Sequence, residues 1–309
     1  MTDPLRDPPG ERAVEELLSF GVVNLDKPAG PSAHQVAAWV RDLAGVDRAA
    51  HAGTLDPKVT GCLPTMLGDA TRLAPVFLEG SKEYVAVLEL HGLAPTDAES
   101  TIAEFETEIY QKPPRKSAVA RRLRSREIYE LDLLELQDRQ ALLRIRCESG
   151  TYVRKLCHDL GLALGTGGHM GALRRVATDP FDDTDLRTLQ DLADGLAWAR
   201  EDDGSSARGA DEDEHEAFLR EVVSPAERAM AHLPAITIAP SAAREVAEGA
   251  PVYAPGVVDY DDAAAALDPG DDDLLACYTP DGSAVCLGKL VGDLDAESGE
   301  VVSLERVLV

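Results

Sequence analysis

The chain divides into two parts that differ in their pattern of hydrophobic and polar residues. Up to about residue 200, segments with apolar residues at helical spacing are interleaved with segments in which apolar and polar residues alternate, as in strands. From Leu233 onward, short apolar runs are separated by Gly, Pro and Asp, which is typical of a small β-barrel of about 75 residues. The sequence therefore predicts a mixed α/β domain followed by a compact β module.

The first domain contains an ordered set of expected elements. Ser32 is a plausible N-cap for the helix that follows it. Residues 51–61 (HAGTLDPKVTG) are too rich in Gly, Thr and Pro for regular structure and are expected to form a loop. We expect strands at 21–26, 82–92, 127–136 and 141–149, and helices at 32–45, 69–80, from near Ser149 to 165, and 185–199.

The charge of the chain is strongly negative. The formal net charge is −26 and the pI is about 4.5, which alone argues against nucleic acid because phosphate binding needs a basic surface. A second interpretation is a surface adapted to molar salt, where acidic side chains keep a protein hydrated. The acidic stretches 201–216 and 259–273 are expected to be solvated loops, the first of them a linker.

Cysteine usage and the N-terminus indicate a cytoplasmic protein. No two of the cysteines form a CxxC pair, so a zinc ribbon and a disulfide framework are both disfavoured. The acidic N-terminus has no apolar core of a signal peptide, and no run approaches the roughly 20 apolar residues of a membrane span. We expect reduced, buried thiols at all five cysteines: Cys62, Cys147, Cys157, Cys277 and Cys286.

One segment is an exception to the acidity. Residues 112–126 carry seven basic side chains and no acidic one. A phosphate backbone is the favoured partner, because Arg gives bidentate contacts to phosphate; neutralisation by the protein's own acidic surface is the alternative. In molar salt the Debye length falls to about 3 Å, so RNA binding there would depend on close contacts and stacking rather than on long-range attraction.

The candidate catalytic group is Asp56, in the sequence GTLDP. Asp before Pro is a common turn, so these five residues alone do not identify a catalytic carboxylate. The longer segments around it are more specific: HAGTLDPKVTG at 51–61, KEYV at 82–85, GTYVRKL at 150–156, GVVNLDKPAGPSAHQV, QKPPRKSAVARRLRSREIY, and GLALGTGGHMGALRRV followed by DPF.

Together these segments resemble the pseudouridine synthase family, which includes the bacterial enzymes that make pseudouridine-55 in tRNA. The resemblance is strongest to its archaeal and eukaryotic branch, the dyskerin-type catalytic subunits of box H/ACA ribonucleoproteins. It runs from about residue 20 to 200 and resumes in the tail, which resembles a PUA-type RNA-binding module.

The resemblance implies an α+β catalytic domain with a mixed, mainly antiparallel sheet, followed by a small PUA β-barrel. The implied division is an N-terminal extension (1–19) that packs on the PUA module, a catalytic domain (20–232) and the PUA domain (233–309). Neither a cofactor nor a metal is implied, and the sequence has no GxGxxG and no metal-ligand cluster.

Site residues follow from the resemblance position by position. Asp56 matches the family's essential aspartate, and Tyr84 matches the tyrosine that stacks on the target base and is implicated in proton transfer at C5. Tyr152 and Arg154 match the site tyrosine and the arginine that pairs with the aspartate. His51 matches the histidine associated with the flipped-out nucleotide.

The remaining matches concern binding. Leu173, with Arg174 or Arg175, lies in the stretch that lines the family's pocket. The basic segment is expected to contact substrate RNA through Lys112, Arg115, Arg121, Arg122 and Arg124. Guide RNA is expected at the turn formed by Gly249, Val252, Pro255 and Gly256 in EGAPVYAPGV.

The chemistry accounts for these residue types. Pseudouridylation breaks the N1–C1′ bond and rejoins the base through C5, with no net redox change. The carboxylate must be ionised to attack C1′ or to abstract a proton, and a paired Arg154 favours that state. Tyr152 and Arg154 would diverge by about 200° on a regular helix, so the helix is expected to start around them and leave Tyr152 in its entry turn.

Some positions depart from the family pattern. Ala50 and Ala52 stand where glycine is usual, which is tolerable at negative φ. Arg115 replaces the usual leucine after the prolines, and the tail carries the acidic insertion at 259–273.

Three functions remain open. The first is a guide-dependent H/ACA enzyme that works on rRNA with small proteins of the Nop10, Gar1 and L7Ae type. The second is a stand-alone tRNA pseudouridine-55 synthase, and the third is a non-catalytic RNA-binding scaffold. RNA is the partner in all three.

Overall fold

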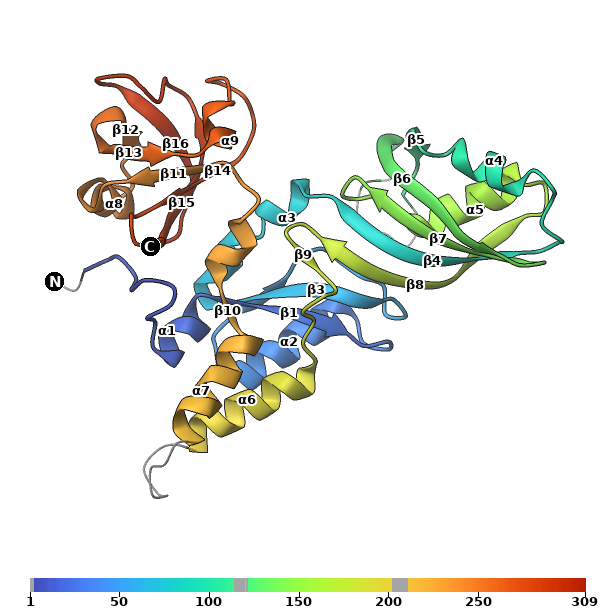
Figure 1. Cartoon of the computed structure of the whole chain (residues 1–309), viewed down its shortest axis with the longest axis horizontal. Coiled ribbons are helices and arrows are strands. Elements are labelled where there is room, and N and C mark those ends of the chain that lie inside the picture. The colour runs from blue at the N-terminus through green and yellow to red at the C-terminus, as the bar shows by residue number, and fades with distance from the viewer. Residues whose placement is uncertain (1–2, 114–119, 121, 202–210) are drawn as a thin grey trace.

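The structure is a computed structural model that describes residues 3–113, 120, 122–201 and 211–309. Two sheets organise these residues. The larger sheet extends from the centre to the right of the molecule, and the smaller one forms a separate lobe at the upper left (Figure 1). Helices α6 and α7 lie below the central strands (Figure 1).

The larger sheet has ten strands and is mainly antiparallel. Among its named strands only β3 and β8 pair in parallel, which confirms the mixed sheet expected from the sequence. Its path runs through β10 (Ser224–Pro225), β1 (Gly21–Lys27), β3 (Thr60–Leu67), β8 (Gly168–Thr178), β4 (Lys82–Leu90), β7 (Gln140–Cys147), β6 (Arg124–Leu136) and β5 (Glu108–Gln111), with β2 (Ala49–His51) on β3 and β9 (Phe181–Asp182) on β8.

Helices bury their apolar sides against this sheet in one hydrophobic core. Alternate residues of β4 and β7 enter that core together with the apolar faces of α2 and α5. Ser32 caps α2 as expected, since its side chain accepts from the Gln35 amide at 3.1 Å. The helical segments are α1 (Val14–Ser19), α2 (Ala33–Ala44), η1 (Gly68–Leu73), α3 (Val76–Glu79), α4 (Ala98–Ala103), α5 (Val153–Ala163), α6 (Leu189–Glu201), α7 (Asp211–Val222) and η2 (Ala226–Met230).

The C-terminal residues form a compact β unit with its own core, as the change in hydrophobic pattern at Leu233 predicts. Its six strands follow one path, in which β11 and β14 are parallel neighbours. In path order they are β12 (Val252–Tyr253), β16 (Glu300–Val307), β15 (Ala284–Leu290), β14 (Leu275–Tyr278), β11 (Ala235–Ile238) and β13 (Val257–Tyr260); the unit also holds α8 (Pro240–Ala247), η3 (Ala254–Gly256) and α9 (Asp262–Ala265).

The two units share a hydrophobic cluster, in which β1 and β3 residues pack with residues of β14 and β15. The N-terminal chain adds polar contacts to the same junction. The buried guanidinium of Arg12 donates to both carboxylate oxygens of Glu227 at 2.8 and 2.6 Å. Ser283 donates to the Asp7 carbonyl at 3.1 Å. Residues from the start of the chain therefore fasten the C-terminal unit to the larger sheet.

Two acidic stretches contain more regular structure than the sequence indicated. The prediction of a loop or linker through residue 216 was wrong from Asp211 onward, because Asp211–Val222 is helical. Leu219 and Val222 of α7 are buried against α6. Acidic residues in the first turn also stabilise a helix, because they interact favourably with the positive end of its dipole. The stretch after 259 likewise contains the end of β13 and α9, for which Asp261 caps the Ala264 amide at 2.7 Å.

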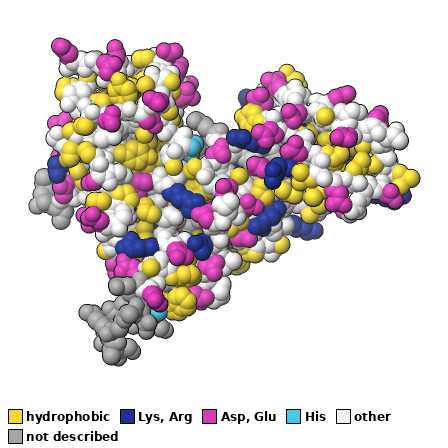
Figure 2. Space-filling model, viewed as in Figure 1, with side chains coloured by type: hydrophobic (Ala, Val, Ile, Leu, Met, Phe, Trp, Pro, Cys, Tyr) yellow, Lys and Arg dark blue, Asp and Glu magenta, His cyan; other side chains and the backbone are white. Residues whose placement is uncertain are grey.

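Acidic side chains are spread over both lobes of the surface, while Lys and Arg gather around the middle of the visible face (Figure 2). On the side of β7 and β8 away from the helices, arginines are paired with carboxylates: Arg144 with Glu83 at 3.2 Å and Arg174 with Asp26 at 2.9 Å. This face of the sheet is consequently not a free basic patch.

Candidate active site

Asp56 lies in the irregular segment between β2 and β3, where the sequence predicted a loop. The backbone next to Asp56 is held by the side chain of Lys27, the last residue of β1. The Lys27 ammonium is fully buried and donates to the carbonyls of Pro28, Pro57 and Val59 at 2.9, 3.1 and 2.8 Å. Burial lowers the pKa of Lys27, and the negative charge of Asp56 opposes that shift.

The two ends of the loop are joined by Arg175 of β8. Its guanidinium is 1% exposed and donates to the carbonyls of Ala52 at 2.9 Å and Cys62 at 2.7 Å. Gly61, at φ +99°, is required here: a Cβ would lie 2.1 Å from the Arg175 carbonyl oxygen. Arg175 and Lys27 therefore hold the Asp56 loop in one shape.

Asp56 forms an ion pair with Arg154 through Oδ2 and Nη2. The two side chains are 47% and 49% exposed, so the pair lies at the open surface of the site rather than inside the protein. The ion pair holds one carboxylate oxygen of Asp56 in place, and a carboxylate oxygen is the group that attack or proton abstraction requires. The pairing predicted from the sequence is present.

Tyr84 of β4 lies directly across the sheet from Arg175 of β8. The ring is 9% exposed. Burial raises the pKa of Tyr84, and the nearby Arg175 guanidinium opposes this shift. The phenol is consequently neutral at ordinary pH, so its hydroxyl can donate or relay a proton.

Tyr152 is the N-cap of α5, with φ −94° and ψ 94°. The expectation that the helix leaves this residue in its entry turn is confirmed, although α5 begins at Val153 rather than near Ser149. Since Tyr152 is outside the helix, the angle between it and Arg154 is not fixed by helical geometry. The Tyr152 amide donates to the side-chain oxygen of Gln111 at 2.8 Å, and the Gln111 side-chain nitrogen donates to the Tyr152 carbonyl at 3.2 Å.

His51 ends β2 and meets His34 of α2 edge to face, with the ring centroids 4.6 Å apart. Its Nε2 lies 3.4 Å from Nδ1 of His34. Burial, then the neighbouring His34 and Arg175, lowers the pKa of His51 to about 4. The imidazole is therefore neutral at neutral pH and can recognise a nucleotide by hydrogen bonding or stacking rather than by charge.

The low pKa of His51 predicts a specific pH dependence of stability. The unfolded chain binds a proton at His51 near pH 6.5, whereas the folded chain does so only near pH 4. The stabilisation is complete above pH 6.5 and is lost as the pH falls towards 4. As the pH falls from 6.5 towards 4, we expect the free energy of unfolding to decrease less for His51→Gln than for the wild type. Urea unfolding at the two ends of this pH range measures the difference. His158→Gln, at an exposed position on α5, is the control; parallel curves for His51→Gln and wild type would contradict the assignment.

The other pocket and basic positions fall into different environments. Leu173 of β8 is partly buried opposite Ala86 and shares the face of Arg175. Arg174 points to the opposite face, where it pairs with Asp26, so the structure brings Arg175 and not Arg174 to the Asp56 loop. Of the basic positions, Lys112, Arg122 and Arg124 are exposed, and Arg115 and Arg121 lie outside the described residues.

The predicted guide-RNA turn joins α8 to β13. Gly249 has φ +97° with open space around it, and Pro255 is exposed. Val252 is 1% exposed within the core of the C-terminal unit, and a Cβ at Gly256 would lie 2.7 Å from the Ala242 Cβ. Of the four residues named for this turn, Gly249 and Pro255 are therefore the exposed ones, and Val252 can offer only its backbone.

Sequence reasoning missed Lys27, Gln111 and His34. Each lies within a quoted segment: Lys27 in LDKPAGP, Gln111 immediately before the basic segment, and His34 in SAHQV. A buried lysine at a strand end before Pro is a signal of backbone anchoring, but only the structure shows which carbonyls it holds.

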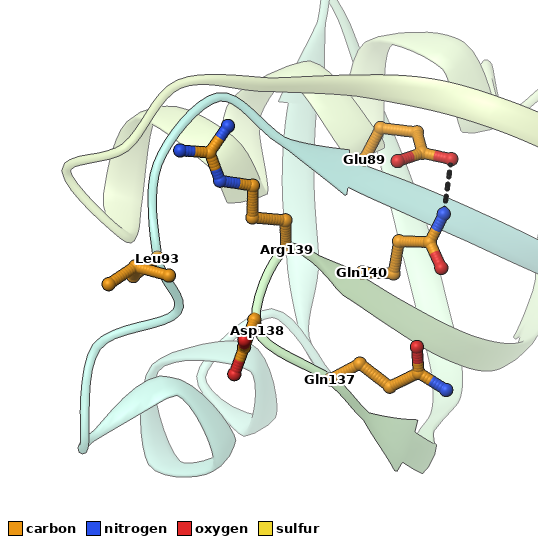
Figure 3. Close-up of a pocket in the computed structure, with 6 residues that line it drawn as sticks. All are labelled: Glu89, Leu93, Gln137, Asp138, Arg139 and Gln140. Carbon is orange, nitrogen blue, oxygen red and sulfur yellow. Dashed lines mark hydrogen bonds between the residues drawn. The ribbon is translucent and has the colours of Figure 1, made fainter.

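A shallow cleft of about 550 Å³ lies elsewhere, at the opposite end of β4 and β7 from Tyr84. Figure 3 shows Gln140 hydrogen-bonded to Glu89, and Arg139 and Asp138 on the turn before it. This cleft contains no paired carboxylate and guanidinium that resembles the Asp56 site. Within the described ranges no group of three metal-ligating side chains gathers, and no helix is both long and apolar enough to cross a membrane.

The chain is similar to known proteins along most of its length. Residues 41–153 match the model of the TruB family pseudouridylate synthase N-terminal domain, residues 154–231 that of the tRNA pseudouridylate synthase B C-terminal domain, and residues 6–37 the DKCLD domain. The chain is 66% identical over 305 residues to the "Probable tRNA pseudouridine synthase B" of Halobacterium salinarum, covering 99% of both. The chain belongs to the TruB family of pseudouridylate synthases.

The relationship extends to other archaea and to solved structures. A Methanopyrus kandleri protein of the same name is 44% identical, covering 98% of this chain and 86% of its own. A chain in the crystal structure of a Cbf5–Nop10–Gar1 complex is 40% identical with a TM-score of 0.87, covering 100% of this chain and 91% of that one. A chain of an H/ACA ribonucleoprotein bound to a substrate RNA containing 2′-deoxyuridine is 39% identical with a TM-score of 0.86, covering 100% and 92%. The similarity to these solved structures therefore spans the whole chain.

Proposed function

We propose that this TruB-family enzyme isomerises uridine to pseudouridine in RNA with Asp56 as its catalytic carboxylate. The observation that carries the proposal is the ion pair between Asp56 and Arg154, whose carboxylate lies on a loop that Lys27 and Arg175 fix from two sides. A carboxylate paired with a guanidinium in a rigid, partly open site suits an attack on a sugar carbon.

The proposed reaction balances without a cofactor. In one route Asp56 attacks C1′ as the N1–C1′ bond breaks, and the Asp56–C1′ bond breaks again when C5 of the turned base bonds to C1′. In the other route Asp56 takes a proton from the sugar, elimination breaks the N1–C1′ bond, and the proton returns to the sugar as C5 bonds to C1′. In both routes the proton on C5 leaves and N1 gains one. In this proposal Tyr84 supplies an aromatic face for an extruded uridine, and its neutral phenol takes part in the proton transfer at C5.

The substrates are proposed from the similarities. Relatives of this chain carry the name tRNA pseudouridine synthase B, which supports uridine-55 of tRNA as a target. Similar chains occur in a complex with Nop10 and Gar1 and in an H/ACA ribonucleoprotein bound to substrate RNA. We therefore favour an enzyme that is directed to rRNA by box H/ACA guide RNA, with small proteins of the Nop10, Gar1 and L7Ae type, and that also modifies tRNA in the cytoplasm.

The division into domains is part of this proposal. Residues 20–232 act as the catalytic domain, residues 233–309 as a PUA domain, and residues 1–19 as an extension packed on the latter. The hydrogen bond from Ser283 to the Asp7 carbonyl supports that placement of the extension, and the ion pair of Arg12 with Glu227 ties the extension to the catalytic domain as well. Guide RNA is proposed to contact the exposed Gly249 and Pro255.

A guide-dependence assay separates the two substrate modes. In molar salt, we expect the assembled particle to modify a target rRNA only when a matching guide RNA is present, because pairing with the guide presents the uridine. We expect uridine-55 of free tRNA to be modified more slowly by the protein alone. Primer extension at both sites measures this. Full-rate modification of tRNA by the lone chain, with no guided product, would favour a stand-alone enzyme; RNA binding without product at either site would favour a scaffold.

A further inference from the structure

The end of β1 and the segment after it lie alongside the Asp56 loop and hold it at the Pro57 carbonyl. That carbonyl accepts from the Lys27 ammonium at 3.1 Å and from the Gly30 amide at 2.8 Å. The same segment then leads into α2, whose second residue is His34. The His34 side chain contacts the residue from which the loop starts, so this part of the chain holds the loop at a second point.

The second point is His51, the last residue of β2. Nδ1 of His34 lies 3.4 Å from Nε2 of His51, and the two rings meet edge to face at an interplanar angle of 83°. The next residue is Ala52, whose amide donates to the Pro64 carbonyl at 2.8 Å and whose carbonyl accepts from the buried Arg175 guanidinium. The histidine contact is therefore one residue away from the place where Arg175 fixes the loop.

The contact with His34 is the side-chain hydrogen bond that orients the His51 ring. The other ring nitrogen of His51, Nδ1, is buried and makes no hydrogen bond within the described part of the chain. His34 lies on a well-fixed element, since it belongs to the first turn of a helix that Ser32 caps. A side chain on a capped helix can hold a neighbouring ring in one orientation more precisely than a loop residue can.

We propose that His34 is a positioning residue that orients the His51 ring and thereby fixes the start of the loop that carries Asp56. The group that acts is the Nδ1 nitrogen of His34, because it is the hydrogen-bond partner of His51 Nε2. The inference rests on the proposed isomerase function, in which the loop must hold the carboxylate at a sugar carbon. It adds to that site a residue whose contact is made at the start of the loop and not with the carboxylate.

Three substitutions at His34 identify the nitrogen that acts, with enzyme in excess over RNA. His34→Leu removes both nitrogens, and we expect the single-turnover rate constant to fall about three- to tenfold, the scale of one lost hydrogen bond, with an unchanged Kd for RNA. His34→Asn places an amide at the position of Nδ1 and should restore the rate constant. His34→Gln places its amide near Nε2, the nitrogen that does not contact His51, and should behave as His34→Leu.

The comparison of Asn with Gln keeps the test valid if the Leu variant folds poorly. Rescue by Gln and not by Asn would overturn the proposal, because the other ring nitrogen would then be the one that acts. A weaker Kd with an unchanged rate constant in His34→Leu would also overturn it, because His34 would then be an RNA contact.

The matched control is His169→Leu. His169 also offers its Nδ1 to Nε2 of another histidine, His91, at 3.1 Å, but both residues are exposed at the end of β4 and β8 away from Tyr84. We expect its rate constant to equal that of wild type. A loss as large as that of His34→Leu would overturn the proposal, and so would an unchanged rate constant in His34→Leu.

The titration of His51 separates the hydrogen bond from the charge of His34. Burial is the largest cause that lowers the pKa of His51 to about 4, followed by the neighbouring His34 and Arg175. Both His34→Leu and His34→Asn remove the first of these neighbours, so NMR of labelled histidines should show a higher pKa of His51 in both. His34→Asn should then restore the rate constant without restoring the pKa. A rate constant that followed the pKa instead would overturn the proposal.

Hydrogen exchange tests the loop directly. The Ala52 amide, which donates to the Pro64 carbonyl, should exchange faster in His34→Leu than in wild type. Its exchange should be unchanged in His34→Asn and in His169→Leu. Equal exchange in His34→Leu and wild type would overturn the proposal. This readout needs no product, so it tests the positioning role even where the isomerase assignment itself fails.

Discussion

Asp56→Asn is expected to abolish pseudouridine formation, by at least about 10³-fold, while RNA binding stays within about twofold of wild type. Asparagine has the same shape and can still accept from Arg154, so the loop and the RNA surface are kept. It has no charged oxygen to attack C1′ or to abstract a proton. The measurement is the pseudouridine content of digested RNA after single-turnover incubation, with RNA affinity measured in parallel.

Asp26→Asn is the matched control for this change. Asp26 also pairs with an arginine, through two bonds to Arg174 at 2.9 and 3.1 Å, but on the other face of the sheet. We expect its activity within about threefold of wild type, because a part-exposed ion pair contributes little to stability. Retained turnover in Asp56→Asn would reject Asp56 as the catalytic carboxylate, and equal losses in both variants would indicate a general effect of neutralising an aspartate.

Much of the fold could be predicted because its signals are local. The alternation in KEYVAVLEL predicts β4, and burial in the structure alternates at every residue of that strand. Ser32 and the apolar spacing after it predict α2 and its cap. The change in hydrophobic pattern at Leu233 locates the C-terminal unit, because its short apolar runs between turn residues differ in length from the long elements before them.

What could not be predicted depends on pairing between distant segments. The sequence offered Arg174 or Arg175 as a pocket residue without deciding between them, since neighbours on a strand face opposite sides and only the register with β4 shows which one meets Tyr84. Helix α7 was missed because its acidic composition is also that of a solvated loop, and its buried face appears only when α6 is beside it.

The proposed catalytic residues and the residues that hold them in place also differ in how well the sequence shows them. Asp56 and Arg154 lie in motifs through which the chain resembles the pseudouridine synthase family, and the resemblance implies their roles. Lys27, Gln111 and Arg175 act on backbone carbonyls and amides, and a sequence does not show which carbonyl a side chain reaches. The acidic surface and the basic segment coexist for a related reason: net charge describes the whole chain, whereas RNA binding needs only a local surface.

Arg175→Met is expected to lower the free energy of unfolding by about 3 kcal/mol and to reduce turnover at least 100-fold, because two charge-assisted hydrogen bonds are lost inside the protein. Removing a buried charge recovers part of the desolvation cost, but the Ala52 and Cys62 carbonyls are left without this donor, and both ends of the Asp56 loop are released. Urea unfolding and single-turnover kinetics measure the two effects.

Arg174→Met is the matched control for Arg175→Met. It removes the same side chain one position earlier on β8, but Arg174 is 38% exposed and pairs with Asp26 at the surface, so we expect a cost of only about 0–1 kcal/mol and near-normal turnover. The difference between the two variants isolates the loop from the general effect of losing an arginine on this strand. Equal stability and equal activity in both would mean that the Asp56 loop keeps its shape without Arg175, and that the carboxylate is positioned by Lys27 and the Arg154 pair alone.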